Sequence, residues 1–571
     1  MLKICAALGE TRALSRSIRL IAAALTFAMA AGAAQAAPRD LKAGAVAASD
    51  QFGAAAAREV LRKGGNAVDA AVATGFALSV TYPEAGNIGG GGFMTLYVDG
   101  KPYFLDYRET APAAASANMY LDAKGEVVPN LSLTGNLAAG VPGTVKGLWE
   151  AHHRFGKLSW AQDLAPAIRL ASQGFAPSKI MVAVRDGDHK QFEGETNFAT
   201  YFGSFKAGQV FRQPELAATL RRIAKDGDKG FYEGPTADLI VAQMGRGKVK
   251  GLITKDDLKS YKVAWREPIQ AEWRGFHVIT APPPSSGGIA LLQLLDMKQD
   301  DKALFKGVTL NSPQYMHLVS ELEKRVFADR AAYLGDPDFV KNPVQALIDP
   351  AYVARRAAEV DPQKPSALAA VKPGLEKPQT THFSIVDKWG NAVSNTYTLN
   401  GDYGAGVVVE GAGFLLNDEM DDFSSKPGVP NQFGVVGSDA NAIGPNKRPL
   451  SSMTPTILTK DGKLAMVIGT PGGSRIFTSV FQVLADVYDY DLPLPKALAQ
   501  LRFHHQLLPE NTIFSEPYAP FDAGLTKALA ERGYKVEDQD YNGDIEAIRI
   551  VGGMPQPASD PRQRGVSMVV K

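Results

Sequence analysis

Paired hydroxyl side chains stand where a connecting segment ends and a strand-like pattern starts. Residues 377–400, KPQTTHFSIVDKWGNAVSNTYTLN, begin this pattern at Thr380 and Thr381 and reverse direction at Gly390. A three-residue hairpin loop often has glycine in its last, left-handed position. Counting outward equally from this turn sets Thr380 opposite Thr398, and opposed side chains on one face of a hairpin lie about 5 Å apart. A single bulge would shift this register by one residue.

These two hydroxyl groups could form a nucleophilic site. Cutting the peptide bond between Gln379 and Thr380 would give Thr380 a free α-amine, whose ordinary pKa of about 7.7–8.0 suits a general base at neutral pH. The amine would lie beside its own hydroxyl, the arrangement of an amino-terminal threonine nucleophile, and Thr398 could orient either group. Taken alone, the spacing favours a simpler interpretation, a pair of threonines across a sheet, because such pairs are common.

The elements that would position these residues change character along the chain. Two helices are predicted around Gly64-Gly65, the second of them buried, and a hairpin is predicted to turn at Asp99-Gly100. Residues 142–360 are predicted to be mostly helical, and residues 361–379, rich in proline, lysine and alanine, to form an exposed flexible connector. Four later stretches are predicted to contain strands: THFSIVD, NAVSNTYT, GVVVEGAGFLLN and MTPTILTKDGKLAMVIG.

A helix-rich first part therefore meets a strand-rich second part, and strand pairs occur in both. We expect sheets from the two parts to stack face to face with helices outside, which is an α+β fold with αββα layering. The length of 571 residues, with 45% apolar and 21% charged residues, suits a large globular core. The net charge of +1 favours neither nucleic acid nor an acidic membrane surface as a partner.

The first 36 residues are predicted to be a signal peptide. Basic residues precede the apolar stretch LIAAALTFAMAAGAA, and Ala34-Gln35-Ala36 supplies the small residues that a signal peptidase recognises, so we expect cleavage before Ala37. A retained membrane anchor is the alternative, and in a Gram-negative bacterium the destination would be the periplasm. No later apolar run approaches the roughly 20 residues needed to span a bilayer. Cys5 is the only cysteine, so the mature chain has no disulfide and no thiolate site.

Several motifs follow one another in a characteristic order. They are GGNAVDAAVA, GGGGFMTLY, LDYRETAP, QTTHFSIVD, GNAVSNTYTLN, LLNDEMDDF, GPNKRPLSSMTPTI and GTPGGSRI. Together they closely resemble the γ-glutamyltranspeptidase family of N-terminal-nucleophile hydrolases, over essentially the whole mature chain. The resemblance implies a four-layer αββα sandwich of two stacked, mainly antiparallel sheets flanked by helices. It also implies a precursor that cuts itself between Gln379 and Thr380 into a large subunit, residues 37–379, and a small catalytic subunit, residues 380–571.

The same resemblance implies a reaction and a set of site residues. Thr380 would take the γ-glutamyl group from an amide such as glutathione and pass it to water, an amino acid or a peptide, with no cofactor and no metal. The α-carboxylate of the glutamyl group would bind Arg108, whose planar guanidinium matches two oxygens. Further implied residues are Ser451 and Ser452 for the carboxylate, Asn400, Glu419 and Asp422 for the α-ammonium group, and the Gly472 and Gly473 N–H groups for the oxyanion.

From the residues alone, simpler interpretations of these motifs stay open. Arg108 also fits an exposed strand position, and DEMDDF also fits a solvated acidic turn or a calcium loop. A phosphate loop at GTPGGSR is excluded, because no Gly-Lys-Ser/Thr follows the glycines. The adjacent pairs His152-His153 and His504-His505 lack zinc spacing and are predicted to be structural or surface residues. His382 should share the face of Thr380, where it could shape the site.

One position departs from the family pattern. In the predicted lid loop KPGVPNQFGVVGSD, Phe433 stands where some bacterial members have a tyrosine that hydrogen-bonds the Asn400 equivalent. We therefore expect a looser lid and easier entry of water. Two other functions are considered: a glutaryl or cephalosporin acylase of the same fold family, and a non-catalytic exported binding protein, which would stay uncut.

Overall fold

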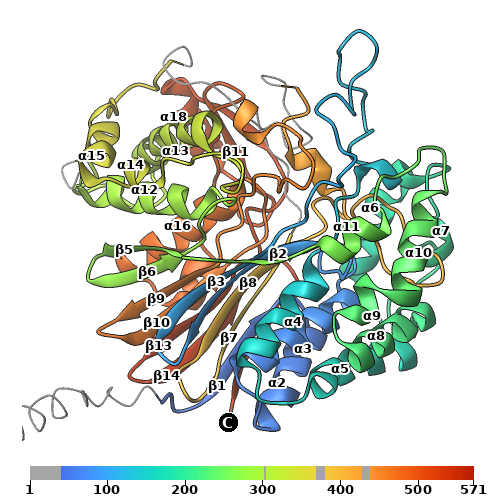
Figure 1. Cartoon of the computed structure of the whole chain (residues 1–571). Helices are drawn as coiled ribbons and strands as arrows, with labels where there is room; N and C mark the ends of the chain where they lie inside the picture. Colours follow the sequence, from blue (N-terminus) through green and yellow to red (C-terminus); the bar gives the residue numbers. More distant parts are fainter. Residues whose placement is uncertain (1–39, 301–303, 368–379, 427–437) are drawn as a thin grey trace, which may run out of the picture. The chain divides into compact units, whose positions relative to one another are not determined.

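Two antiparallel sheets lie at the centre of the fold in the computed structural model (Figure 1). The structure describes residues 40–300, 304–367, 380–426 and 438–571, and its elements lie in one unit, Leu41–Lys571. The first sheet has seven strands in the order β15-β1-β7-β8-β2-β3-β4. Their bounds are β1 Gly44–Ala48, β2 Gly91–Val98, β3 Lys101–Tyr107, β4 Ala264–Arg266, β7 Thr381–Val386, β8 Ala392–Thr398 and β15 Val566–Val570.

The second sheet has six strands in the order β14-β13-β10-β9-β6-β5 and stacks on the first. Ala47 and Val386 of the first sheet share one buried apolar cluster with Ile457, Val467 and Ile548 of the second. A separate parallel pair is formed by β11, Thr512–Ser515, and β12, Lys535–Asp538. The bounds of the second sheet are β5 Ile269–Trp273, β6 Phe276–Thr280, β9 Thr456–Lys460, β10 Lys463–Gly469, β13 Glu546–Val551 and β14 Met554–Ser559.

Helices cover the outer face of each sheet, which confirms the predicted αββα layers (Figure 1). On the first sheet these are α2 Gln51–Arg62, α3 Ala67–Thr81, α4 Thr144–Phe155 and α5 Trp160–Gln173, continued by α6 Lys179–Phe192, α7 Phe198–Phe202, α8 Pro214–Asp226, α9 Lys229–Tyr232, α10 Gly234–Met244 and α11 Lys255–Ser260. On the second they are α12 Gly287–Asp300, α13 Pro313–Tyr333, α14 Val344–Leu347, α15 Pro350–Ala358, α16 Arg475–Tyr488, α17 Leu494–Leu498 and α18 Ala523–Glu531. None of the helices in the described part of the chain has both the length and the apolar composition of a bilayer-spanning segment.

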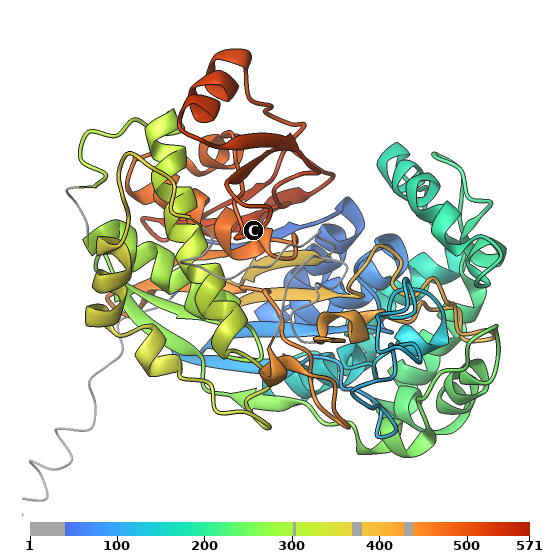
Figure 2. The same ribbon diagram turned by 90° about the horizontal axis from the view of Figure 1, so that it is seen from above.

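Both predicted hairpins are confirmed by their turns. In the β7–β8 hairpin, Thr381 pairs with Tyr397, and Gly390 has the left-handed φ of 81° that its place in the loop requires. The register is therefore the one counted from the sequence. In the β2–β3 hairpin, Asp99 and Gly100 have φ values of 50° and 71°, the pattern of a type I′ turn. Figure 2 shows β2 in blue beside the yellow strands of the other hairpin, with which β2 pairs through β8.

Three predictions about the elements were incomplete or wrong. The middle region was predicted to be mostly helical, but residues 264–280 contain β4, β5 and β6, the last of which pairs with β9. The stretch GVVVEGAGFLLN is not a strand, because positive φ angles at Gly411 and Gly413 interrupt it and leave only one bridge, Val408 to Leu415. The two parts also do not form one sheet each, since each sheet contains strands from both. Most of the predicted connector lies outside the described residues.

Candidate functional site

The two candidate hydroxyl groups lie at the open end of the β7–β8 hairpin. Thr380 stands one residue before β7, and Thr398 is the last residue of β8. Because Thr381 pairs with Tyr397, continuing the register sets Thr380 beside Thr398. Both residues are buried, with 8% and 3% of their surfaces exposed. The Thr398 hydroxyl accepts a hydrogen bond of 2.8 Å from the Asn400 N–H, which fixes the chain as it leaves the strand.

Thr380 and Thr398 line a small pocket, here called the first pocket, with a volume of about 20 Å³. Of the predicted site residues in the described part of the chain, all except Gly472 line it: Thr380, Thr398, Gly473, Arg108, Asn400, Glu419, Asp422, Ser451 and Ser452. Gln379 and Phe433 lie outside the described residues. Residues that are far apart in the sequence therefore meet at one end of the central hairpin.

Arg108 is the cationic centre of the first pocket. It follows β3, is 1% exposed, and forms ion pairs with Glu419 through Nη1 and with Asp422 through Nη2. Its Nη2 also donates to the carbonyl of Leu450 at 3.3 Å. The two carboxylates belong to a short 3₁₀ turn, Glu419–Asp422. A ligand with one positive and one negative group could therefore exchange partners with this cluster of opposite charges.

Glu109 is a buried carboxylate beside Arg108 that the sequence analysis missed. Its Oε2 lies 3.8 Å from Arg108 Nη1, and no amide or hydroxyl donor of the described chain reaches either of its oxygens. Burial, partly offset by Arg108, raises the pKa of Glu109 to about 7. Burial also raises the pKa of the neighbouring Glu419. The only sequence signal was the position of Glu109 directly after Arg108.

Arg330 is a second missed residue of the first pocket. It lies on α13, and its side chain donates from Nε to Ser286 Oγ at 3.0 Å and from Nη2 to Ser452 Oγ at 3.3 Å. A second guanidinium thus lies next to the serines that were predicted to hold a carboxylate. The sequence offered no signal for it, because Arg330 occurs in an ordinary helical stretch.

The predicted oxyanion glycines connect β10 to α16. Gly472 and Gly473 have positive φ values of 142° and 55°, conformations that glycine adopts without the steric strain of a β-carbon. Gly473 lines the first pocket, whereas Gly472 lines a second pocket of about 100 Å³. Thr380 lines both pockets, and each of the two glycines lines one of them.

The histidines are not placed to act as general bases on Thr380. His382 is fully buried between the sheets, where its Nδ1 lies 2.8 Å from Thr396 Oγ1, and burial lowers its pKa to about 3. His504 and His505 are also fully buried. His152 lies instead with Asp69 and Asp163, the only group of three potential metal ligands found among the described residues.

Comparison with known proteins places the whole chain among close relatives. The profile of the family described as Gamma-glutamyltranspeptidase matches residues 53–570. A glutathione hydrolase proenzyme from Pseudomonas aeruginosa is 63% identical over 96% of this chain and 98% of its own length. The structure resembles a cephalosporin acylase from Bacillus halodurans, with a TM-score of 0.79 and 27% identity over 93% of this chain and 96% of that one. It also resembles a chain of a gamma-glutamyltranspeptidase from Pseudomonas nitroreducens, with a TM-score of 0.57 and 62% identity over 58% of this chain and 99% of that one.

Proposed function

The chain belongs to the γ-glutamyltranspeptidase family, and on that premise we propose that it is a self-processing γ-glutamyl transferase and glutathione hydrolase with Thr380 as its nucleophile. The observation that carries the proposal is the position of Thr380 at the junction of two pockets. An acyl-transfer enzyme needs the scissile bond at its nucleophile, with the acyl group on one side and the leaving group on the other. The first pocket has the charges to receive the acyl group.

In this proposal, the first pocket binds the zwitterionic head of the glutamyl group. Its α-carboxylate pairs with Arg108 and accepts hydrogen bonds from Ser451 and Ser452. Its α-ammonium group is held by Asn400, Glu419 and Asp422. Support comes from the mutual ion pairs of Arg108 with the two carboxylates, because a zwitterion presents the same two charges in exchange. Arg330 donates to Ser452 and would orient that serine.

Catalysis then proceeds through an ester on Thr380. The α-amine of the cut chain takes the proton of the Thr380 hydroxyl as the oxygen attacks the γ-carbonyl. The N–H groups of Gly472 and Gly473 stabilise the oxyanion, and one such donor is typically worth about 3 kcal/mol. Thr398 orients the nucleophile. Collapse expels the amine of the donor, and water or an acceptor amine then releases the glutamyl group from the enzyme.

Maturation requires two cuts in the chain. We propose removal of the leader, residues 1–36, followed by self-cleavage between Gln379 and Thr380 into the subunits 37–379 and 380–571. The proenzyme name of the Pseudomonas aeruginosa relative supports a processed precursor. A leader of this kind would export the protein to the periplasm.

The proposal is tested by sequencing and by one substitution. Edman degradation of the purified active protein should return Thr-Thr-His-Phe for the shorter chain. We expect Thr380→Ala to leave a single uncut chain that does not release p-nitroaniline from γ-glutamyl-p-nitroanilide, whereas Thr380→Ser should still be cut. An active protein without this new terminus, or full activity of Thr380→Ala, would refute the proposal.

A second candidate is an acylase that removes glutaryl side chains from cephalosporins. The structural similarity to the Bacillus halodurans acylase favours it. A glutaryl group has no α-ammonium, however, and would leave Glu419 and Asp422 without a cationic partner once it displaced them from Arg108. We therefore expect faster turnover of γ-glutamyl-p-nitroanilide than of glutaryl-p-nitroanilide, and the reverse order would favour the acylase.

A further inference from the structure

The second pocket is lined mainly by residues that do not line the first pocket. It lies between the segment after α3, the helix α6, the glycine loop before α16, and the loop 540–544. Its volume of about 100 Å³ is larger than that of the first pocket. Because Thr380 lines both, a substrate whose acyl group occupies the first pocket would direct its leaving group into the second.

All of the acidic or basic side chains in the described lining of the second pocket are carboxylates. Its described lining contains four carboxylates, Glu84, Asp402, Asp540 and Asp544, and no lysine, arginine or histidine. The nearby Arg564 is already engaged, since its guanidinium pairs with Glu84 and lies 4.1 Å from the centre of the Tyr82 ring. A positive group that entered this pocket would meet carboxylates, and a negative group would meet no cation of the lining.

A carboxylate next to this lining is negatively charged at mildly alkaline pH. Asp188 of α6 interacts with Asp402, and burial raises the pKa of both carboxyl groups, that of Asp188 to about 6. At pH 8 the Asp188 carboxylate is therefore ionised. Asp544 is buried, and burial raises its pKa, whereas Asp540 is exposed at the rim. The pair and the rim carboxylate together supply the field that an incoming amine would experience.

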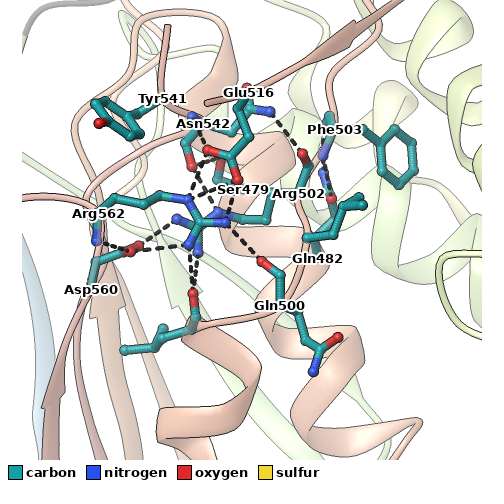
Figure 3. Close-up of polar contacts among 12 residues, drawn as sticks. Ser479, Gln482, Gln500, Arg502, Phe503, Glu516, Tyr541, Asn542, Asp560 and Arg562 are labelled. Atoms are coloured by element: carbon teal, nitrogen blue, oxygen red, sulfur yellow. Dashed lines mark hydrogen bonds and ion pairs between the residues drawn. The ribbon is translucent and has the colours of Figure 1, made fainter. Parts of the chain in front are cut away.

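A buried network of charges holds the loop 540–544 in place (Figure 3). Arg502 Nε donates to the carbonyl of Asn542 at 2.8 Å, and the Asn542 N–H donates to Glu516 Oε2 at 3.0 Å. Arg562 pairs with Glu516, and both side chains are fully buried. On the other side of the loop, Arg475 donates to the carbonyl of Asp540 at 2.6 Å. The loop carboxylates are therefore held in position before any ligand arrives.

We propose that the second pocket receives the acceptor amine, and that its carboxylates favour acceptors with an additional positive charge, such as alkane diamines, over acceptors with a carboxylate. This inference rests on the proposed function. The acceptor nitrogen attacks the carbonyl of the γ-glutamyl ester, and the bond from that carbon to Thr380 Oγ breaks. The proton lost by the nitrogen passes to Thr380 Oγ by way of the α-amine, so no further reactant is needed.

The test uses three acceptors of equal chain length that differ in the distal charge. They are 1,4-diaminobutane, butylamine and 4-aminobutanoate, with γ-glutamyl-p-nitroanilide as donor and the wild-type enzyme at pH 8. We expect kcat/KM for transfer to fall in that order, by about tenfold from the first acceptor to the last, as for charges several ångströms apart in a partly solvated site. High salt should reduce the differences in kcat/KM among the three acceptors because it screens the rim carboxylate.

The double substitution Asp402→Asn/Asp540→Asn should reduce the differences in kcat/KM among the three acceptors. The matched control Asp538→Asn removes an exposed carboxylate outside the lining and should leave these differences unchanged. A flat or reversed order in the wild-type enzyme, or a series insensitive to both salt and the double substitution, would overturn the inference alone. Hydrolysis of the donor in the absence of acceptor reports on the proposed function separately. If no p-nitroaniline is released at all, the proposed function fails and this inference fails with it.

Discussion

At the scale of single residues, the charged side chains of the first pocket form ion pairs with one another. Arg108 contacts both Glu419 and Asp422, and the volume of about 20 Å³ that remains is enough for about one water molecule. A zwitterionic ligand must therefore replace these pairs rather than fill an empty space. The affinity of such a ligand depends on the difference between the ion pairs that it forms with the pocket and the ion pairs that it breaks. We therefore expect the hydrogen-bonding geometry of the Arg108 guanidinium to affect binding more than its positive charge does.

Substituting Arg108→Lys tests this point. Lysine keeps the positive charge but cannot donate two parallel hydrogen bonds to a carboxylate. We expect kcat/KM for γ-glutamyl-p-nitroanilide to fall about 10- to 100-fold, mainly through KM, which corresponds to about 1.4–2.8 kcal/mol. Steady-state kinetics measure the change. The control Arg246→Lys alters an arginine that is 44% exposed and paired with Glu410, and it should change neither parameter. Equal effects of both substitutions would contradict the prediction.

At the scale of elements, three helix ends share one buried polar cluster. Asp69 lies in the first turn of α3 and accepts hydrogen bonds from the N–H groups of Asn66 and Lys157, whereas His152 comes from α4 and Asp163 from α5. Both oxygens of Asp163 are buried and lack a hydrogen-bond donor among the described groups. Burial first, and then the charge of Asp69, raises the pKa of Asp163 to about 9.

This raised pKa predicts a loss of stability with increasing pH. Above its ordinary pKa near 4, Asp163 loses its proton in the unfolded chain but keeps it in the folded one, so the free energy of unfolding falls until the pH reaches about 9. The slope is at most about 1.4 kcal/mol per pH unit. We expect Asp163→Asn to reduce the decrease in stability between pH 6.5 and 8.5, as measured by urea unfolding. Asp238→Asn, an exposed site, should follow the wild type, and identical slopes for all three proteins would contradict the prediction.

The sequence predicted those elements whose conformation is set by neighbouring residues. Asp99-Gly100 and Gly390 fix their turns locally, and the register that brings Thr380 to Thr398 follows by counting. The sequence analysis missed β6, because its partner β9 lies about 180 residues further along the chain and local periodicity carries no trace of that pairing. Glu109 and Arg330 were missed for the same reason, since their roles depend on contacts with distant residues.

At the scale of the whole molecule, both sheets contain strands from both sides of Thr380. In the first sheet β1 lies between β7 and β15, and β2 pairs with β8. In the second sheet β6 pairs with β9. The proposed cut before Thr380 would therefore divide the chain without dividing either sheet. Each subunit alone would expose unpaired strand edges and one face of a buried core.

Cleavage is therefore expected to leave the two subunits tightly associated. Purified mature protein should elute from a size-exclusion column as one species that contains both chains, and the chains should separate only in denaturant. Residues 380–571 expressed alone should aggregate, because β7 would lack its pairing with β1, and β8 its pairing with β2. Thr380→Ala, which should stay uncut, is the control for the effect of the cut itself, and its unfolding midpoint should lie close to that of the mature protein. Separation of the two chains under native conditions would show that the shared sheets do not hold the molecule together.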